Sequence, residues 1–231
     1  MDAQNIPADH LKHILVEVEK HGEPRVRLLF GTADVLKSQG AHAAAHGFRP
    51  VLQYTVATRK NTADIALAIH AMELLHSGKA DAFCIVSSDS DFQPLATHLR
   101  EDGRFVLGIG REDTPGALKS ACTKFVPFEV LDQEVDGRAK PIGPKAAKQP
   151  IPDAPGLRKL LLSALQAAQG EDGWALLAAV GSQLQLIDPG FDARKFGRPR
   201  LSVLLRDLGD FEFRPDGQPG PNEAVFVRIR T

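Results

Sequence analysis

The residues best suited to chemistry in this sequence are two carboxylates one residue apart, Asp89 and Asp91. They follow an apolar run at 82–87 that has the composition of a buried strand, and they precede a helical segment. In a sheet of parallel strands, the functional crevice lies at the carboxyl ends of the strands. We therefore expect this pair at the edge of a sheet where a site can form.

Two further acids come from other segments at equivalent positions. Asp2 stands where a first strand should end, and Asp64 opens an otherwise apolar helical segment. Carboxylates that converge without partners raise each other's pKa, and a hard divalent cation relieves their repulsion. Ligand sets made of oxygen alone suit Mg²⁺ or Mn²⁺. The sequence thus predicts one or two such ions, held by Asp2, Asp64, Asp89 and Asp91.

Helix capping is the alternative role for each acid taken alone. Asp89 has the residue type of an N-cap, and Asp64 and Asp91 carry the charge that the start of a helix favours. Four acids at equivalent strand ends favour a shared site instead. Haloacid-type phosphatases and toprim domains carry the same aspartate spacing, but a first strand ending in Asp2 and Asn5 fits neither class.

The elements that would position these acids alternate between strand and helix. Apolar runs predict strands at 25–30, 48–54, 82–87, 104–109 and 125–131, and helical periodicity predicts helices at 9–20, 34–46, 63–76, 91–101 and 115–122. Such alternation is typical of α/β folds whose parallel sheet has helices on both faces. Only Met1 precedes Asp2, so either the first strand is very short or the polypeptide starts upstream.

Composition and charge narrow the class of protein. Of the 231 residues, 43% are hydrophobic and 25% are charged, which excludes wholesale disorder. The net charge of −1 excludes a protein that holds nucleic acid by bulk basicity. No apolar stretch has membrane-spanning length and the N-terminus lacks the features of a signal peptide, so we expect a cytoplasmic protein. Cys84 and Cys122 lie in apolar runs and are expected to be packing residues rather than nucleophiles.

A proline-rich segment divides the chain. Residues 134–154 have almost no large apolar side chain and contain Pro141, Pro144, Pro150 and Pro152. They predict a semi-extended linker between a first domain at 1–133 and a second at 155–231. The second domain has helical segments at 157–168, 174–184 and 199–208, then alternating strands at 211–214 and 224–229. Three helices followed by a two-stranded wing are the outline of a winged helix.

Several motifs of the first domain occur together in the order of a known family. They are DAQNIP at 2–7, KNTADIAL at 60–67, VSSDSDFQPL at 86–95, GIG at 108–110 and ACTKF at 121–125. Together they resemble the NYN domain, in its LabA-like bacterial branch, over residues 1–131. The resemblance implies a PIN-like nuclease fold and metal-dependent ribonuclease activity. It makes Asp2, Asp64, Asp89 and Asp91 the catalytic metal-site residues, with Asn5 and Ser88 as polar neighbours.

Other residues near these motifs have less specific roles. The turn with Lys60 and Asn61 precedes Asp64 closely enough to face a phosphate, and a solvated basic turn is the alternative. His70 lies about 120° around the helix from Asp64 and is expected to be a structural or rim residue. The glycines of the GIG motif are expected in a tight turn.

The motifs of the second domain also match a known pattern. They are WALLAAVGSQL at 174–184, FDARKFG at 191–197 and LSVLLRDL at 201–208. These segments resemble the LOTUS (OST-HTH) domain over residues 155–231, which implies a winged helix associated with RNA binding or protein contacts. The aromatic residues Trp174, Phe191 and Phe196 are expected in its core. The basic residues at the start of the third helix are candidates for RNA phosphate contacts: Arg194, Lys195, Arg198 and Arg200.

These observations together predict a metal-dependent ribonuclease, endonucleolytic in its cleavage, with an RNA-binding winged-helix module. We expect RNA, single-stranded or structured, as the partner of this protein. We expect no interaction with a membrane. Protein contacts or dimerisation through the C-terminal module are a further expectation. A non-catalytic RNA-binding adaptor with a degenerate PIN-like domain is the alternative from a different class. A single-stranded DNA nuclease is a third reading that the sequence leaves open.

Overall fold

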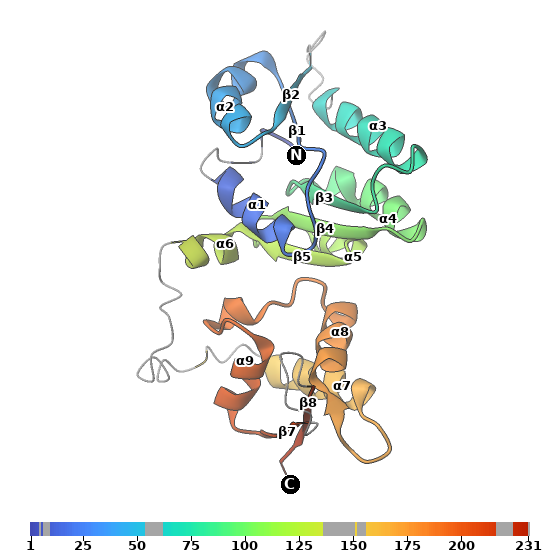
Figure 1. The fold of residues 1–231 in the computed structure, drawn as a ribbon, viewed down its shortest axis with the longest axis vertical. Helices are drawn as coiled ribbons and strands as arrows, with labels where there is room; N and C mark the ends of the chain where they lie inside the picture. The colour runs from blue at the N-terminus through green and yellow to red at the C-terminus, as the bar shows by residue number, and fades with distance from the viewer. Residues whose placement is uncertain are drawn as a thin grey trace. The chain divides into compact units, whose positions relative to one another are not determined.

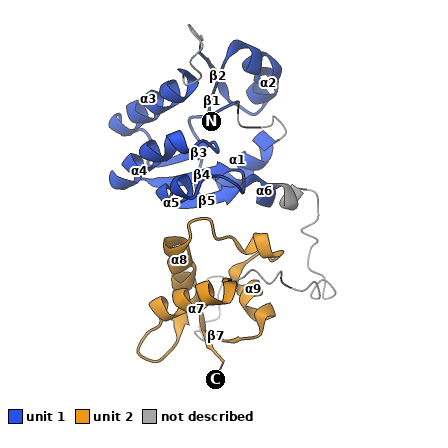
Figure 2. Ribbon diagram, turned by 180° about the vertical axis from the view of Figure 1, so that it is seen from behind, with its two compact units in different colours: residues 1–136 blue, residues 137–231 orange. Residues whose placement is uncertain are grey.

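The chain folds into two compact units, Met1–Asp136 and Gly137–Thr231, which Figure 2 shows in different colours. The computed structural model describes residues 1–4, 6, 10–53, 62–135, 151, 156–215 and 224–230. The linker predicted at 134–154 lies almost entirely outside the described residues.

The first unit is built on parallel strands. β1 (Leu28–Gly31) pairs with β2 (Arg49–Leu52). A second parallel group has the order β3-β4-β5, formed by β3 (Ala82–Val86), β4 (Phe105–Gly110) and β5 (Lys124–Pro127). With helices flanking these strands, the predicted α/β class is confirmed (Figure 1).

Residues 1–3 join the two groups of strands. The amide of Phe30 in β1 donates to the Met1 carbonyl at 2.9 Å, and the Phe30 carbonyl accepts from the Ala3 amide at 2.8 Å. On the other side, the Asp2 amide donates to the carbonyl of Val86 in β3 at 3.2 Å. Asp2 thereby forms a parallel bridge with Phe30. This short stretch takes the place predicted for the first strand and links β1 to β3.

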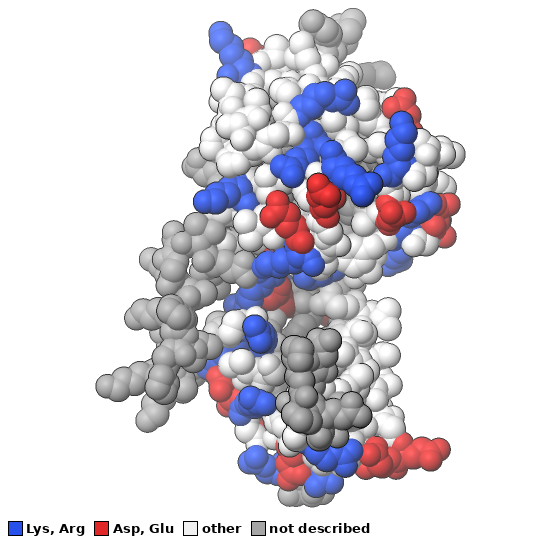
Figure 3. All heavy atoms as spheres, viewed as in Figure 1, with Lys and Arg blue, Asp and Glu red and all other residues white. Residues whose placement is uncertain are grey.

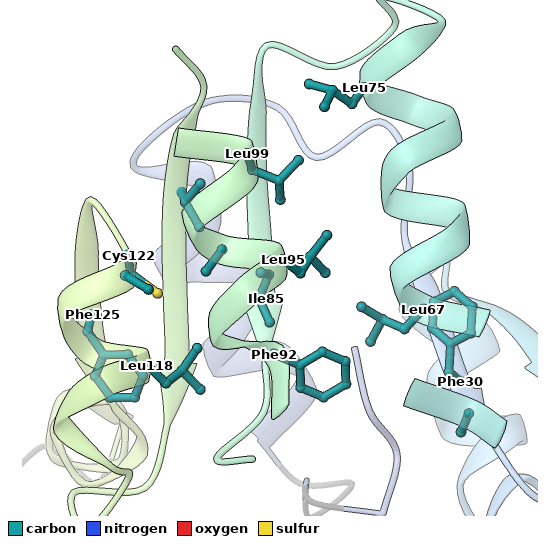
Figure 4. Close-up of a cluster of buried hydrophobic side chains, with 14 residues drawn as sticks. Phe30, Leu67, Leu75, Ile85, Phe92, Leu95, Leu99, Leu118, Cys122 and Phe125 are labelled. Carbon is teal, nitrogen blue, oxygen red and sulfur yellow. The ribbon is translucent and has the colours of Figure 1, made fainter. Parts of the chain in front are cut away.

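Helices cover both faces of these strands (Figure 1). They are α1 (Leu11–Glu19), α2 (Ala33–Ala45), α3 (Thr62–His76), α4 (Gln93–Glu101), α5 (Gly116–Ala121) and α6 (Phe128–Val135). One buried cluster packs α3, α4 and α5 against the strands and contains Phe92, Leu99 and Phe125 (Figure 4). A second cluster packs α1 and α6 against β3, β4 and β5. Burial of each large apolar side chain contributes roughly 1.5–3 kcal/mol, so these clusters hold the sheet edge in place.

The predicted elements need correction at two places in the first unit. The run at 125–131 is not one strand, because β5 ends at Pro127 and α6 begins at Phe128. The apolar residues of this run fit both the two-residue period of a strand and the 3.6-residue period of a helix. In the structure Phe128 and Leu131, three residues apart on α6, are both buried. Gly108 and Gly110 lie inside β4 rather than in a tight turn. A Cβ atom on Gly110 would lie only 2.7 Å from the Ser87 carbonyl oxygen, so close packing explains the glycine.

The two cysteines pack on opposite sides of the sheet. Cys84 contacts the cluster beneath α1 and α6, and Cys122 belongs to the cluster beneath α3, α4 and α5. Burial raises the pKa of both thiols to about 12, so they stay protonated at neutral pH. Their predicted role as packing residues is confirmed.

The second unit has the winged-helix outline. α7 (Leu157–Ala168), α8 (Leu177–Ile187) and α9 (Leu201–Leu208) pack around Leu161, Leu184 and Leu204. Its described strands are antiparallel in the order β6-β8-β7: β6 (Ala175–Leu176), β8 (Val225–Ile229) and β7 (Phe211–Pro215). The segment predicted as a helix from residue 174 thus starts as a strand and joins the wing. A strand of two residues is too short to show a period of two in the sequence.

We expect Gly110→Ala to destabilise the first unit, because the added methyl group would meet the Ser87 carbonyl oxygen and the Thr114 hydroxyl at less than van der Waals distance. The free energy of unfolding in urea should fall by ~1–3 kcal/mol. Gly116→Ala is the matched control, since nothing lies within 4 Å of its Cβ position in α5, and it should be neutral or slightly stabilising. Equal stability of the two variants would contradict the close approach at Gly110.

Candidate functional site

Asp89 and Asp91 lie just beyond the carboxyl end of β3, around the 3₁₀ turn η2 (Ser90–Phe92). The Asp91 amide donates a hydrogen bond to Asp89 Oδ1 at 2.9 Å, so Asp89 caps this turn. Phe92 is buried and anchors the turn in the core, whereas Asp91 is exposed. Capping engages one carboxylate oxygen of Asp89, so it is compatible with a role in a shared site.

Asp64 reaches the same edge from the first turn of α3. One turn further along, Leu67 points toward Phe92 within the buried cluster (Figure 4). This apolar contact holds the start of α3 close to η2. The packing of Leu67 on Phe92 thus determines how near Asp64 lies to Asp89 and Asp91.

Asp2 is the most deeply placed of the acids, with 3% of its surface exposed. Its carboxylate Oδ1 accepts a hydrogen bond from the Gln4 amide at 2.9 Å. Its own amide is bonded to Val86, the last residue of β3. Residues 1–3 therefore place a carboxylate between the end of β1 and the end of β3.

The structure brings the four predicted acids into electrostatic contact. Burial raises the pKa of Asp64 from 3.8 to about 6, and the charges of Asp2, Asp89 and Asp91 add to this increase. Each acid comes from a strand end or from the helix that packs beside it. The edge therefore concentrates negative charge, as the sequence predicted.

The four acids offer only carboxylate oxygens as ligands, and their charges repel one another. Both properties suit the binding of a hard divalent cation. In the described parts of the chain, however, no three His, Cys, Asp or Glu side chains are already grouped to hold one metal ion. The amides of Gln4 and Asp91 hold the carboxylates of Asp2 and Asp89 in their present orientations. Binding of an ion would therefore require side-chain rotation.

The loop after β4 contributes residues that the sequence did not reveal. The Ser88 hydroxyl accepts a hydrogen bond from the Arg111 amide at 2.8 Å, which gives Ser88 a structural role and places Arg111 beside Asp89. The Arg111 side chain is exposed. In the same loop Thr114 is 4% exposed, and its hydroxyl has no hydrogen-bond partner in the described structure. The sequence did hold one signal for Arg111: it follows β4 directly, just as Asp89 lies shortly after β3, and the ends of neighbouring parallel strands meet at one edge of the sheet.

Three predicted neighbours lie outside the described residues: Asn5, Lys60 and Asn61. His70, in contrast, is well defined. Its Nδ1 donates to the Ala66 carbonyl at 2.9 Å, and its ring lies edge-on to Phe30 with centroids 5.3 Å apart. These contacts give His70 the structural role expected from the sequence.

The structure divides the basic cluster of the second unit. Arg194 forms an ion pair with Asp192 at 2.6 Å, and Arg198, 9% exposed, pairs with Asp207. Both guanidinium groups therefore stabilise the module internally, in place of the phosphate contacts predicted for them. Lys195 is half-buried and Arg200 is exposed at the N-cap of α9, so these two residues stay candidates for RNA contact.

The aromatic residues of the second unit also differ from expectation in one case. Phe191 is buried and Phe196 packs against the same cluster, as predicted. The prediction was wrong for Trp174, which is half-buried and lies outside that cluster, just before β6. Its surroundings were invisible in the sequence because its neighbours on the wing lie at least 40 positions later.

The molecular surface carries charges of both signs. In the view of Figure 3, Lys and Arg side chains are interspersed with Asp and Glu side chains on both units. The face seen in this view is therefore not one broad basic patch. No helix among the described residues is long and apolar enough to cross a membrane.

Comparison with known proteins gives two domain matches. An NYN domain model matches residues 1–131, and an OST-HTH/LOTUS domain model matches residues 154–222. No curated protein matches the chain. A solution NMR structure of an uncharacterized protein from Nitrosomonas europaea is 32% identical, covers 40% of this chain and 90% of that one, and has a TM-score of 0.32. A crystal structure of a Vibrio parahaemolyticus protein of unknown function is 18% identical, covers 54% and 87%, and has a TM-score of 0.44.

We expect Asp64→Asn to stabilise the protein at neutral and alkaline pH. The pKa of this carboxyl is about 6 in the fold against an ordinary 3.8, so its ionisation destabilises the fold as the pH rises through that interval. Thermal unfolding at about pH 8 should show a gain on the order of 1 kcal/mol, a value reduced for solvent screening of this half-buried group, and the gain should vanish below about pH 4.

Asp34→Asn is the matched control, because Asp34 also lies in the first turn of a helix, α2, where the helix dipole favours its charge. At about pH 8, where Asp64→Asn should raise stability, it should lower stability slightly. A gain for Asp64→Asn that did not depend on pH would contradict the interaction among the four acids.

Proposed function

Because the NYN domain model matches more than half of it, the chain belongs to the NYN domain family, and we propose that it is a metal-dependent endoribonuclease with an RNA-binding module. The NYN match supports the nuclease and the OST-HTH/LOTUS match supports the RNA-binding module. One observation carries the metal dependence: burial and three neighbouring carboxylates raise the pKa of Asp64 to about 6. Such a concentration of carboxylates is what a bound divalent cation neutralises.

In this proposal Asp2, Asp64, Asp89 and Asp91 hold one or two Mg²⁺ or Mn²⁺ ions. When bound, such an ion activates water and stabilises charge on the scissile phosphodiester. The backbone amides of Gln4 and Asp91 keep the carboxylates of Asp2 and Asp89 at the sheet edge, and these side chains would rotate there to hold an ion. Asp64 is the acid that carries a proton near pH 6 in the absence of a cation, so metal binding and proton release are coupled there.

Arg111 supplies positive charge at the same edge. Its backbone is held beside Asp89 by the Ser88 hydroxyl, and its side chain is exposed. A guanidinium group binds phosphate through two parallel hydrogen bonds, which fixes orientation as well as charge. We therefore assign Arg111 to a phosphate of the RNA strand next to the one held at the acids.

The second candidate is a non-catalytic RNA-binding adaptor. One observation favours it: among the described residues, no three His, Cys, Asp or Glu side chains already lie close enough together to hold one metal ion. The two candidates differ in a measurable way, because the adaptor binds RNA but never cleaves it when metal is added. A single-stranded DNA nuclease is distinguished by offering DNA of the same sequence in parallel.

We expect Asp89→Asn to lower Mn²⁺ affinity by at least about tenfold in calorimetry, because the amide keeps the capping oxygen but loses the charge. Mn²⁺-dependent cleavage of a circular single-stranded RNA, which has no ends for an exonuclease, should be lost in the same variant. Thermal unfolding should show no loss of stability, because the variant keeps the cap and removes one of the repelling charges.

Asp102→Asn serves as the control, because it removes an acid from the opposite end of α4 and should preserve both activities. Equal Mn²⁺ binding by wild type and Asp89→Asn would rule out the shared metal site. Metal binding without cleavage of any RNA would establish the adaptor.

Deletion of residues 151–231 should raise KM and leave kcat nearly unchanged, because the module contributes binding that is equal in the ground and transition states. Lys195→Glu combined with Arg200→Glu should raise KM in the full chain and reduce its dependence on salt. Arg194 and Arg198 are left intact in this test, since their ion pairs hold the module together. A fall in kcat at constant KM would contradict the separation of binding from chemistry.

A further inference from the structure

The outer face of the wing carries aromatic and arginine side chains side by side. Side chains alternate along β8, so Val227 is fully buried while Phe226 and Arg228 lie on the opposite face. In the antiparallel register, Arg214 of β7 lies opposite Phe226 on one side and Leu176 of β6 lies opposite it on the other. The term wing face is used below for Trp174, Leu176, Glu212, Arg214, Phe226 and Arg228.

Trp174 is the centre of the wing face. The guanidinium carbon of Arg228 lies 4.6 Å from the centroid of its ring, and that of Arg214 lies 4.7 Å away. Arg214 is also 5.5 Å from the ring of Phe226. These are cation–π distances, and they hold two long side chains in defined positions against aromatic surfaces.

Carboxylates contact the same two arginines from the side. Arg228 pairs with Glu212 at 2.8 Å, and Arg214 lies 3.4 Å from Asp172. The Arg214 side chain is 50% exposed, and ion pairs in contact with water are weak enough to exchange. In the described structure Arg214 donates to Asp172 through Nη2, and a guanidinium group has further N–H donors besides this one.

The wing face is not required to complete the core of the module. Trp174 lies outside the buried cluster, which closes around leucines of α7, α8 and α9. The contrast with Arg194 and Arg198 is direct, because those guanidinium groups are largely buried in ion pairs. The side chains of Arg214 and Arg228 are 50% and 41% exposed, so they are available to a ligand in a way that Arg194 and Arg198 are not.

We propose that the wing face binds single-stranded RNA, an inference that rests on the RNA-binding role proposed above for this module. Unpaired bases stack on aromatic rings and on guanidinium planes, and the remaining N–H donors of the arginines bind phosphates. Duplex RNA offers phosphates but no unpaired bases, because its bases are already stacked and paired. Exchange of Asp172 and Glu212 for RNA phosphates keeps both arginines paired in the bound state.

Trp174 is the single tryptophan of the chain, so its fluorescence reports on the wing face alone. The full chain in EDTA, which prevents metal-dependent cleavage, is titrated with a single-stranded oligouridylate about 20 nucleotides long. Wild-type fluorescence should be quenched, with the same Kd as the anisotropy of labelled RNA. The double variant Arg214→Gln, Arg228→Gln should bind at least about tenfold more weakly and lose about 1–2 from the salt slope.

Two variants control for structural effects. Arg158→Gln removes an arginine that is ion-paired with Asp210 at 3.1 Å and comes from α7, outside the wing face, so it should bind RNA like wild type. Trp174→Phe retains an aromatic ring and should retain most of the affinity. If the double variant fails to fold by circular dichroism, quenching of the wild type and the affinity of Trp174→Phe still decide the question.

Two results would show that RNA binds elsewhere: binding without quenching of Trp174, or full affinity in a folded double variant. Either would overturn the wing face as the binding site and leave the proposed function intact. Equal quenching by a duplex of the same length would overturn the preference for single strands. If the full chain bound no RNA at all, the RNA-binding function itself would fail, and the wing face with it.

Discussion

Four hydrogen bonds made by the backbone of residues 1–3, one of them from the Met1 ammonium group to the Leu28 carbonyl, are the constraint on which the first unit depends. They connect Phe30 of β1 to Val86 of β3, and among the described strands no other pairing joins the β1–β2 group to the β3–β4–β5 group. The same three residues carry Asp2. The contact that unites the sheet therefore also delivers a carboxylate to its edge, so the backbone of Asp2 cannot move without a change in the sheet.

The buried cluster balances the repulsion that the site creates. Four acids at one edge oppose folding when they are charged, as the raised pKa of Asp64 shows. Packing of Leu67 on Phe92 holds α3 and η2 together despite that repulsion. Local hydrogen bonds then orient individual carboxylates, and the capping bond of Asp89 is compatible with the role proposed for it in the site.

Features that depend on local pattern could be predicted from the sequence, and features that depend on distant partners could not. The alternation of apolar runs and the acids that follow β3 were sufficient for the α/β class and the acidic edge. Arg198 was misjudged because its partner, Asp207, lies on the following helix, and an arginine in sequence looks the same whether it is exposed or paired. Trp174 was misjudged because β6 has two residues and its neighbours come from β7 and β8. Arg111 gained its position from a hydrogen bond to Ser88, 23 residues earlier.

The placement of the two cysteines has a practical consequence for spectroscopy. Thiolates, not thiols, react with maleimides and iodoacetamides, and Cys84 and Cys122 keep their protons because burial raises both pKa values to about 12. A new cysteine introduced on the surface would therefore carry a fluorophore selectively, with both native residues left in place. Together with Trp174 as the intrinsic donor, one such fluorophore on the second unit gives a site-specific donor–acceptor pair for energy-transfer measurements within that unit.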